Sequence, residues 1–189
     1  MHQPFFDFLQ HYGNIPDSDK DVIGSFLSYD EINEGTHLVE PGMFSNTLYF
    51  ICEGIMKIST LNEKGNFVTY YFLAEDHLST ILRNFQEDTR SEVYLTTVTD
   101  AKLISITKQD LEIVHLKLPY LKAIMDMIFQ EMMLRKINIR NAYLGLDATQ
   151  RYNTFLSTQS NIASRVPLSD VASYLGIAQQ SLSRIRKNK

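Results

Sequence analysis

Short apolar runs separated by turn residues dominate the chain from about residue 35 to residue 108. β-branched and aromatic residues fill these runs, for example at 48–51 and 67–72, and Pro-Gly, Glu-Gly and Asn-Glu-Lys-Gly sequences separate them. Several short strands with regularly spaced turns are typical of a β-sandwich or barrel. Residues 3–29 show a weaker helical pattern. We therefore expect a helical segment followed by a sheet-rich domain.

A helical period begins near residue 118. Neither Gly nor Pro occurs between Pro119 and Gly145, which suit the start and the end of a helix. The apolar positions alternate in spacings of four and three residues, as in the seam of paired helices. We predict a dimer seam on this helix at Leu121, Met125, Ile128, Met132, Arg135 and Ile139.

The same stripe also suits an amphipathic helix that packs on its own domain, and this alternative stays open. Helix length favours dimerisation, because roughly 27 residues span about 40 Å. That length exceeds the face that a small β-domain can cover. Arg135 interrupts the apolar seam and can set the register of a pair.

The segment from Leu168 onwards fits a helix-turn-helix pattern. The pattern requires a small fifth residue, because the two helices touch there, and a glycine at the ninth position, because the turn is sharp. Five further positions must be apolar. Counted from Leu168, all seven positions match: Ala172, Gly176, Val171, Leu175, Ile177, Leu182 and Ile185. We expect Ser169 to cap the first helix.

The outer face of the second helix carries side chains that suit DNA. Gln pairs with adenine and Arg with guanine in the major groove. We therefore predict base contacts from Gln179, Gln180 and Arg184. Hydroxyls and further cations suit phosphate oxygens, and the candidates for backbone contacts are Ser169, Ser181, Ser183, Arg186 and Lys187, with Lys189 beyond them.

Charge is distributed unevenly along the chain, although the net charge is only −4. Residues 1–117 hold 8 Lys and Arg against 18 Asp and Glu, whereas residues 151–189 hold 6 against 1. An acidic body with a basic end indicates a polyanionic partner for that end. No apolar run approaches a membrane span, and the start lacks the pattern of a secretory signal, so we expect a cytoplasmic protein.

Over almost its whole length the chain resembles the Crp/Fnr family of bacterial transcription regulators. The matching residues are 166–177 and 181–186 around the helix-turn-helix, and 39–42, 48–54 and 57–58 upstream. Arg151-Tyr152 together with Val166-Pro167 looks especially like the Bacteroidetes branch. The resemblance implies an α+β fold in three parts: a double-stranded β-helix (jelly roll) sensor with flanking helices at 1–117, a long dimerisation helix at 118–146, and a helix-turn-helix domain at 147–189. The family's base-contacting positions match Gln179, Gln180 and Arg184, and Gln180 replaces a common Glu.

The chain departs from the family in two places. The family usually has a β-hairpin wing after the recognition helix, and we expect it to be absent or shortened because only three residues follow Arg186. Cyclic-nucleotide binders carry Gly-Glu and then Arg-Ser or Arg-Thr. Here Asp76-His77 stands in place of Gly-Glu, whereas Arg90-Ser91 resembles the second pair and is the candidate ligand site. Acidic neighbours would repel a phosphate, so a cyclic nucleotide is disfavoured and the effector is left unidentified.

These observations favour a homodimeric regulator that reads a pseudo-palindromic site in double-stranded DNA, with RNA polymerase as a further candidate partner. The alternative is a sensor module that binds a cyclic nucleotide or another small molecule and has lost DNA binding. An enzyme is not expected, because His37, His77 and His115 are isolated and no nucleophile elbow occurs. The single Cys52 excludes an internal disulfide and disfavours an iron–sulfur cluster. We expect no metal and no cofactor.

Overall fold

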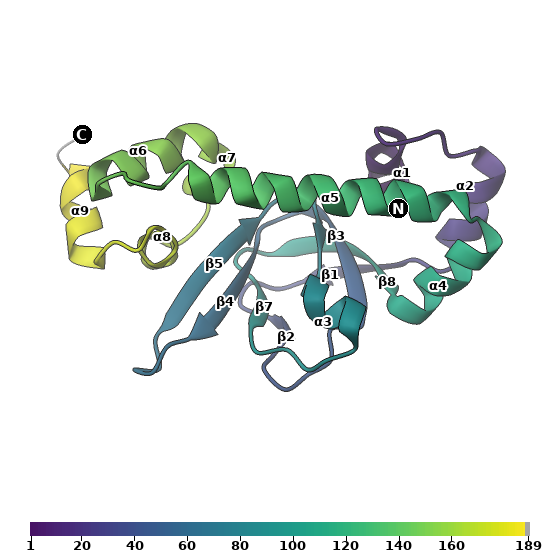
Figure 1. Cartoon of the computed structure of the whole chain (residues 1–189), viewed down its shortest axis with the longest axis horizontal. Helices are drawn as coiled ribbons and strands as arrows, with labels where there is room; N and C mark the ends of the chain where they lie inside the picture. The colour runs from purple at the N-terminus through teal and green to yellow at the C-terminus, as the bar shows by residue number, and fades with distance from the viewer. Residues whose placement is uncertain (188–189) are drawn as a thin grey trace.

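The computed structural model describes residues 1–187 and has a β-roll with helices at both ends (Figure 1). Two four-stranded antiparallel sheets form the roll, in the strand orders β1-β8-β3-β6 and β2-β7-β4-β5. The predicted α+β jelly roll is therefore confirmed. The strands are β1 (Ser28–Ile32), β2 (His37–Val39), β3 (Thr47–Glu53), β4 (Met56–Leu61), β5 (Phe67–Leu73), β6 (Leu78–Ser79), β7 (Tyr94–Thr97) and β8 (Ala101–Thr107).

Aliphatic side chains fill the space between the two sheets. Ile51, Met56 and Leu95 are fully buried there, and Leu103 is 1 % exposed. The strands therefore alternate between this interior and the outer faces, as the period of two requires. Gly54 makes the tight turn from β3 to β4 with φ +101°, where an added Cβ would lie 2.5 Å from the Asp100 carbonyl oxygen.

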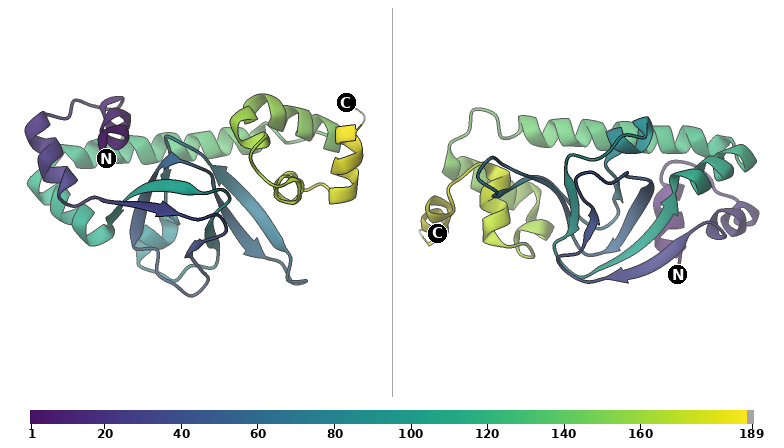
Figure 2. Two further views of the ribbon diagram at one scale, coloured as in Figure 1. Left: turned by 180° about the vertical axis from the view of Figure 1, so that it is seen from behind. Right: turned by 90° about the horizontal axis from the view of Figure 1, so that it is seen from below.

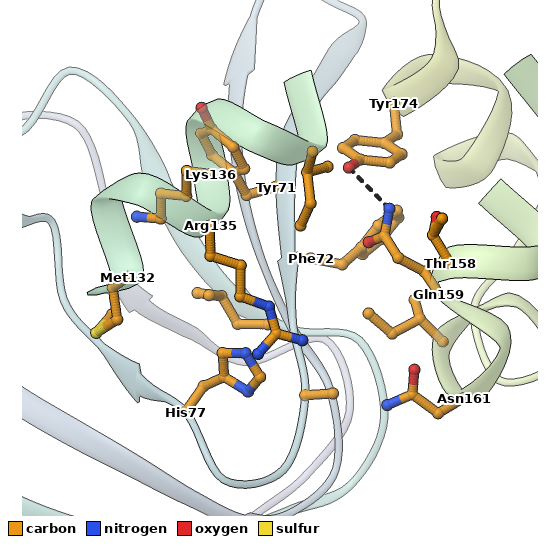
Figure 3. A pocket seen from close by; sticks show the side chains of 14 residues that line it. Tyr71, Phe72, His77, Met132, Arg135, Lys136, Thr158, Gln159, Asn161 and Tyr174 are labelled. Carbon is orange, nitrogen blue, oxygen red and sulfur yellow. Dashed lines mark hydrogen bonds between the residues drawn. The ribbon is translucent and has the colours of Figure 1, made fainter. Parts of the chain in front are cut away.

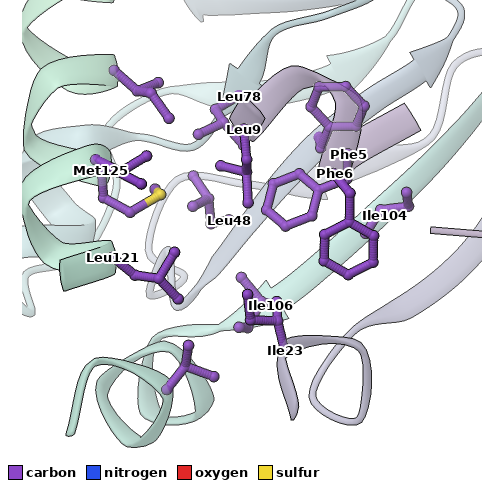
Figure 4. Close-up of a cluster of buried hydrophobic side chains, with 14 of the residues drawn as sticks. Phe5, Phe6, Leu9, Ile23, Leu48, Leu78, Ile104, Ile106, Leu121 and Met125 are labelled. Atoms are coloured by element: carbon purple, nitrogen blue, oxygen red, sulfur yellow. The ribbon is translucent and has the colours of Figure 1, made fainter. Parts of the chain in front are cut away.

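Helices cover the outer face of the first sheet. They are α1 (Gln3–Gln10), α2 (Asp17–Gly24) and α4 (Lys108–Lys117), while the short α3 (Leu82–Glu87) follows β6. Phe5 and Leu9 of α1 pack with Leu48 of β3 (Figure 4). Phe50 of β3 belongs to the same cluster, and its ring lies 5.5 Å from that of Phe5. This packing explains why the N-terminal segment is helical despite its weak pattern.

The long helix α5 (Tyr120–Asn141) belongs to the same cluster and corrects the predicted dimer seam. Leu121, Met125 and Ile128 are at most 4 % exposed in the single chain, so they cannot meet a second one. Met132 packs against this cluster, Ile139 is half-buried, and only Arg135 of the predicted seam is exposed. The stripe packs on the chain's own domain, which was the alternative interpretation.

A second stripe on α5 faces solvent. Ala123, Met127, Leu134 and Ile137 are exposed, and Leu144 extends the stripe into the turn after the helix. Their spacings of three, four and seven residues place them on one helix face. We call these five residues the free stripe of α5.

The described part of the C-terminal domain has four helices, and their core joins the roll. The helices are α6 (Ala148–Thr158), α7 (Ser160–Ala163), α8 (Leu168–Leu175) and α9 (Gln179–Lys187). Phe155 and Leu182, both fully buried, belong to one cluster with Ile55 and Phe72 of the roll. Among the described helices, none combines the length and apolarity needed to cross a membrane.

A bidentate ion pair fastens this domain to the roll beside the shared core. The Arg165 guanidinium donates to both carboxylate oxygens of Glu75, at 2.6 and 3.0 Å. The Glu75 carboxylate also accepts from the Gly54 N–H at 2.8 Å. The Arg165 hydrogen bonds lower the pKa of Glu75 to about 2.

Burial of Ile128 predicts a large effect of its truncation. Ile128→Ala should lower the free energy of unfolding by about 2–5 kcal/mol, because a cavity replaces a buried side chain. Leu116→Ala is the matched control: Leu116 is 82 % exposed, and its truncation should change stability by less than about 0.5 kcal/mol. Urea denaturation measures both. Equal, small effects would contradict the packing of α5 on the roll.

The lowered pKa of Glu75 predicts that the Arg165–Glu75 ion pair contributes to the free energy of unfolding in a pH-dependent way. Glu75→Gln should destabilise the chain at pH 7 by at most about 1 kcal/mol, because the pair is partly exposed. Because the pKa is lowered in the folded state, the contribution is complete above the ordinary value of 4.5 and is lost as the pH falls towards 2. Urea denaturation at pH 7 and pH 3 should therefore show a smaller difference from wild type at pH 3. Glu63→Gln on the exposed β4–β5 turn is the control. The ion-pair contribution would be contradicted if the stability difference between Glu75→Gln and wild type did not shrink at pH 3, or if Glu63→Gln showed the same behaviour.

Candidate nucleic-acid interface

Helices α8 and α9 form a helix-turn-helix around Gly176. Gly176 ends α8 in the left-handed region with φ +63°, which an L side chain rarely adopts. The Ile177 N–H donates to the Ala172 carbonyl at 2.9 Å, which closes the last turn of the helix. The Arg151 guanidinium also donates to the Leu175 carbonyl, so this carbonyl at the end of α8 does not remain unpaired in the turn.

All positions of the predicted motif serve the packing of these two helices. Ala172 is 3 % exposed where the helices approach one another, and Leu182 is fully buried. Ile185 is half-buried against the same cluster. The remaining apolar positions are also buried: Val171, Leu175 and Ile177.

The start of α8 differs from the prediction that Ser169 caps it. The helix begins at Leu168, with Pro167 as its N-cap and no side-chain cap. The Pro167 carbonyl accepts from the N–H groups of Asp170 and Val171. Ser169 therefore lies within the first turn, where its side chain is exposed. Pro167 fixes the backbone where the chain enters the helix, and the Ser169 hydroxyl, two positions later, does not cap it.

The outer face of α9 is exposed, and it points away from the roll. Gln179, Gln180 and Arg184 are exposed, as are the backbone candidates Arg186 and Lys187. The hydroxyl candidates Ser181 and Ser183 are half-buried on α9. Figures 1 and 2 place α9 at the outer end of the molecule, with α8 between it and β5. The predicted base-contacting residues thus share one accessible face, whereas Lys189 lies outside the described residues.

The charge of this face is positive. α9 contains no Asp or Glu, and within residues 1–187 no carboxylate pairs with Arg184, Arg186 or Lys187. Asp170 is the sole carboxylate of residues 151–189. The Lys57 Nζ atom of β4 lies 2.7 Å from it, and both side chains are only 15 % exposed. The roll therefore neutralises the one acidic side chain of residues 151–187 and leaves the cations of α9 without a carboxylate partner there.

Hydrogen bonds from α8 to β5 set the orientation of the motif. The Ser173 hydroxyl donates to the Phe67 carbonyl at 3.1 Å and accepts from the Thr69 N–H at 3.0 Å. The sequence patterns assign no such contact to Ser173 or Lys57. Their partners are more than 100 residues away along the chain, so no local pattern marks them.

The predicted ligand pair Arg90-Ser91 lies in the roll, far along the chain from this motif. The Arg90 guanidinium donates to the Gly42 carbonyl and lies 4.8 Å from the centre of the Phe44 ring, at the surface. The Ser91 hydroxyl is buried and donates to the Val93 carbonyl at 2.7 Å. Both side chains therefore hold the loop before β7. Their role in ligand binding stays a prediction.

Histidines and carboxylates give no further candidate site in the described part of the chain. Among residues 1–187, no three His, Cys, Asp or Glu side chains form a group that would hold a metal ion. Burial lowers the pKa of His77 and of His115, which lie in different parts of the molecule.

Comparison with known proteins gives a result at the level of structure. No protein-family model matches the sequence, and no curated protein matches it. The solved structure of the c-di-GMP-responsive global regulator CLP of Xanthomonas campestris is similar, with a TM-score of 0.73 at 17 % identity, covering 92 % of this chain and 91 % of that one.

Two further structures agree. FixK2 of Bradyrhizobium japonicum has a TM-score of 0.69 at 15 % identity, covering 86 % of this chain and 83 % of its own. A transcriptional regulator of the Crp/Fnr family from Eubacterium rectale has a TM-score of 0.64 at 17 % identity, covering 92 % and 83 %. These matches cover most of the chain, and the chain therefore has the fold of the Crp/Fnr family of transcription regulators.

Proposed function

We propose that this chain is a DNA-binding transcription regulator of the Crp/Fnr type. One observation carries the proposal: the second helix of a helix-turn-helix presents an exposed face without carboxylates, on the side away from the roll. The structures with the same fold support it, because they include a global regulator of gene expression and a transcriptional regulator of the Crp/Fnr family.

In this function α9 is the recognition helix in the major groove. Gln179 and Gln180 at its start read adenine, and Arg184 one turn later reads guanine. Side chains around them fix the register on phosphate oxygens. These are Ser169 on α8, and Ser181, Ser183, Arg186 and Lys187 on α9.

The regulator acts as a homodimer that pairs through the free stripe of α5. Met127, Leu134 and Ile137 are 45–61 % exposed in the single chain, which is unfavourable unless a partner covers them. Their spacing is that of helices that pair along a seam. Pairing places two copies of α9 on successive major grooves of a pseudo-palindromic site, about 34 Å apart.

The roll of this regulator uses Arg90 and Ser91 for its own loop. The Arg90 guanidinium contacts Gly42 and Phe44, and the Ser91 hydroxyl contacts Val93. These contacts support the proposal that the Arg90-Ser91 loop holds no cyclic phosphate. CLP is described as c-di-GMP-responsive, but in this chain the acidic neighbours Glu87 and Asp88 disfavour a phosphate ligand at the Arg90-Ser91 loop.

Base contact is tested by substitution on α9. Gln179→Ala and Arg184→Ala should each weaken binding to the preferred site by about 5- to 150-fold, which corresponds to 1–3 kcal/mol. Lys187→Ala should instead weaken binding to all sequences and reduce the slope of log affinity against log salt by about 1. Fluorescence anisotropy with sites selected from a random DNA library measures all three.

Lys122→Ala is the control for this experiment, since Lys122 is exposed near the start of α5, at the opposite end of that helix from the C-terminal domain. It should leave DNA affinity unchanged. A wild-type chain without sequence preference, or full affinity in the Gln179 and Arg184 variants, would refute the proposed function.

Dimerisation is tested on the free stripe. Leu134→Glu with Ile137→Glu should convert the dimer to a monomer, because each places a charge in the centre of the interface. Sedimentation analysis measures the molecular mass, and Leu116→Glu on α4 is the control at an equally exposed leucine. An unchanged dimer in the double variant, or a monomeric wild type that still binds the palindrome, would contradict pairing through α5.

A further inference from the structure

A cavity of about 140 Å³ lies where the roll, α5 and the C-terminal domain meet. Side chains from all three parts line it (Figure 3). The roll contributes Phe72 and His77, α5 contributes Arg135, and the C-terminal domain contributes Gln159 and Asn161. None of these residues belongs to the DNA-binding face.

The cavity is amphipathic, with a polar mouth and an apolar floor. Arg135 and Asn161 at the mouth are exposed. Phe72 and Ile162 at the floor are 7 % and 6 % exposed, and Ala74 beside them is 2 % exposed. A ligand that fits must therefore combine a polar group with an apolar body.

The charge of the lining is positive and uncompensated. Among the residues that the structure describes, no Asp or Glu lines the cavity. Within residues 1–187 no carboxylate lies within ion-pair distance of Arg135. Figure 3 shows the Arg135 guanidinium beside the His77 ring on one side, with Gln159 and Asn161 opposite. Burial lowers the pKa of His77, and the Arg135 charge lowers it further.

Polar side chains of the lining are already held in place by hydrogen bonds within the chain. The Gln159 side chain is 7 % exposed, and its amide nitrogen donates to the hydroxyls of Tyr143 at 2.8 Å and Tyr174 at 3.1 Å. His77 is held as well, because its Nδ1 atom donates to the Glu75 carbonyl at 2.8 Å. A carbonyl oxygen can only accept, so the proton of this ring is on Nδ1 and the Nε2 atom is left for another partner.

We propose that this cavity binds a small aromatic carboxylate. The carboxylate pairs with the Arg135 guanidinium at the mouth, since the planar fork of arginine suits two carboxylate oxygens. The ring lies on the floor, among Phe72, Ile139 and Ile162. The volume of the cavity suits such a ring, because an apolar cavity of about 150 Å³ accommodates benzene. As the site of an effector this inference rests on the proposed function, whereas binding itself does not.

A ligand in this cavity touches the roll and the DNA-binding domain at once. It bridges Arg135 of α5 to the α6–α7 junction at Gln159, which lies next to Tyr174 of α8 in the same cavity. Binding energy at this place therefore depends on how the C-terminal domain sits on the roll, which is the condition for coupling between two sites.

Calorimetric titration of the full chain with benzoate tests the site. Wild type should bind one benzoate per chain with a Kd of about 1 mM or tighter. Arg135→Gln should weaken binding at least about tenfold, because a hydrogen bond between charged groups is lost, and Arg135→Lys should restore part of it. Arg140→Gln is the matched control, an exposed arginine on the same helix that does not line the cavity.

Three further ligands separate the parts of the proposal. Acetate lacks the ring, benzyl alcohol lacks the charge, and inorganic phosphate has charge without an apolar body. Each should bind at least tenfold more weakly than benzoate. No heat of binding with 10 mM benzoate, unchanged affinity in Arg135→Gln, or phosphate binding as tight as benzoate binding would overturn the inference. DNA anisotropy without benzoate tests the proposed function separately, so the two failures are distinguishable.

Discussion

The packing of α5 on the roll determines where the other parts of the chain lie. Its first half buries Leu121, Met125 and Ile128 in the cluster that also holds α1 and β3. The helix has 22 residues, and at 1.5 Å each it extends about 33 Å as one rod. Figure 1 shows that it continues past the sheets to the C-terminal domain. Because the first half of α5 is packed on the roll, the direction of its second half, and with it the position of the C-terminal domain, is fixed.

The C-terminal domain is not held by the rod alone. Its core includes Ile55 and Phe72 of the roll, and ion pairs and hydrogen bonds flank this apolar contact. The apolar part contributes most of the stabilisation, because partly exposed ion pairs contribute little. The polar contacts instead specify the orientation, since Lys57 and Ser173 have partners only in one arrangement of α8 on β5.

Local patterns predicted the roll, the long helix and all seven positions of the helix-turn-helix, because period, turn residues and glycine geometry act over a few residues. The buried face of α5 was beyond such patterns. Two apolar stripes with similar spacing lie on one helix, and only the position of the roll selects Leu121 over Met127 for burial. Pro119 is predicted to start a helix, and it is the N-cap of α5, two residues after α4 ends at Lys117. The cavity lining and the Arg165–Glu75 pair depend on tertiary contacts between residues far apart in sequence.

The side of the helix-turn-helix that touches the roll has a mechanical consequence. α8 makes the contacts with β5, and α9 lies beyond it. The recognition face is therefore already uncovered while the domain is docked, and no undocking step has to precede DNA binding. In the proposed dimer, DNA binding is then controlled through the distance and angle between the two exposed α9 helices. A small rotation at the C-terminal end of α5 would change whether these helices match the spacing of successive major grooves.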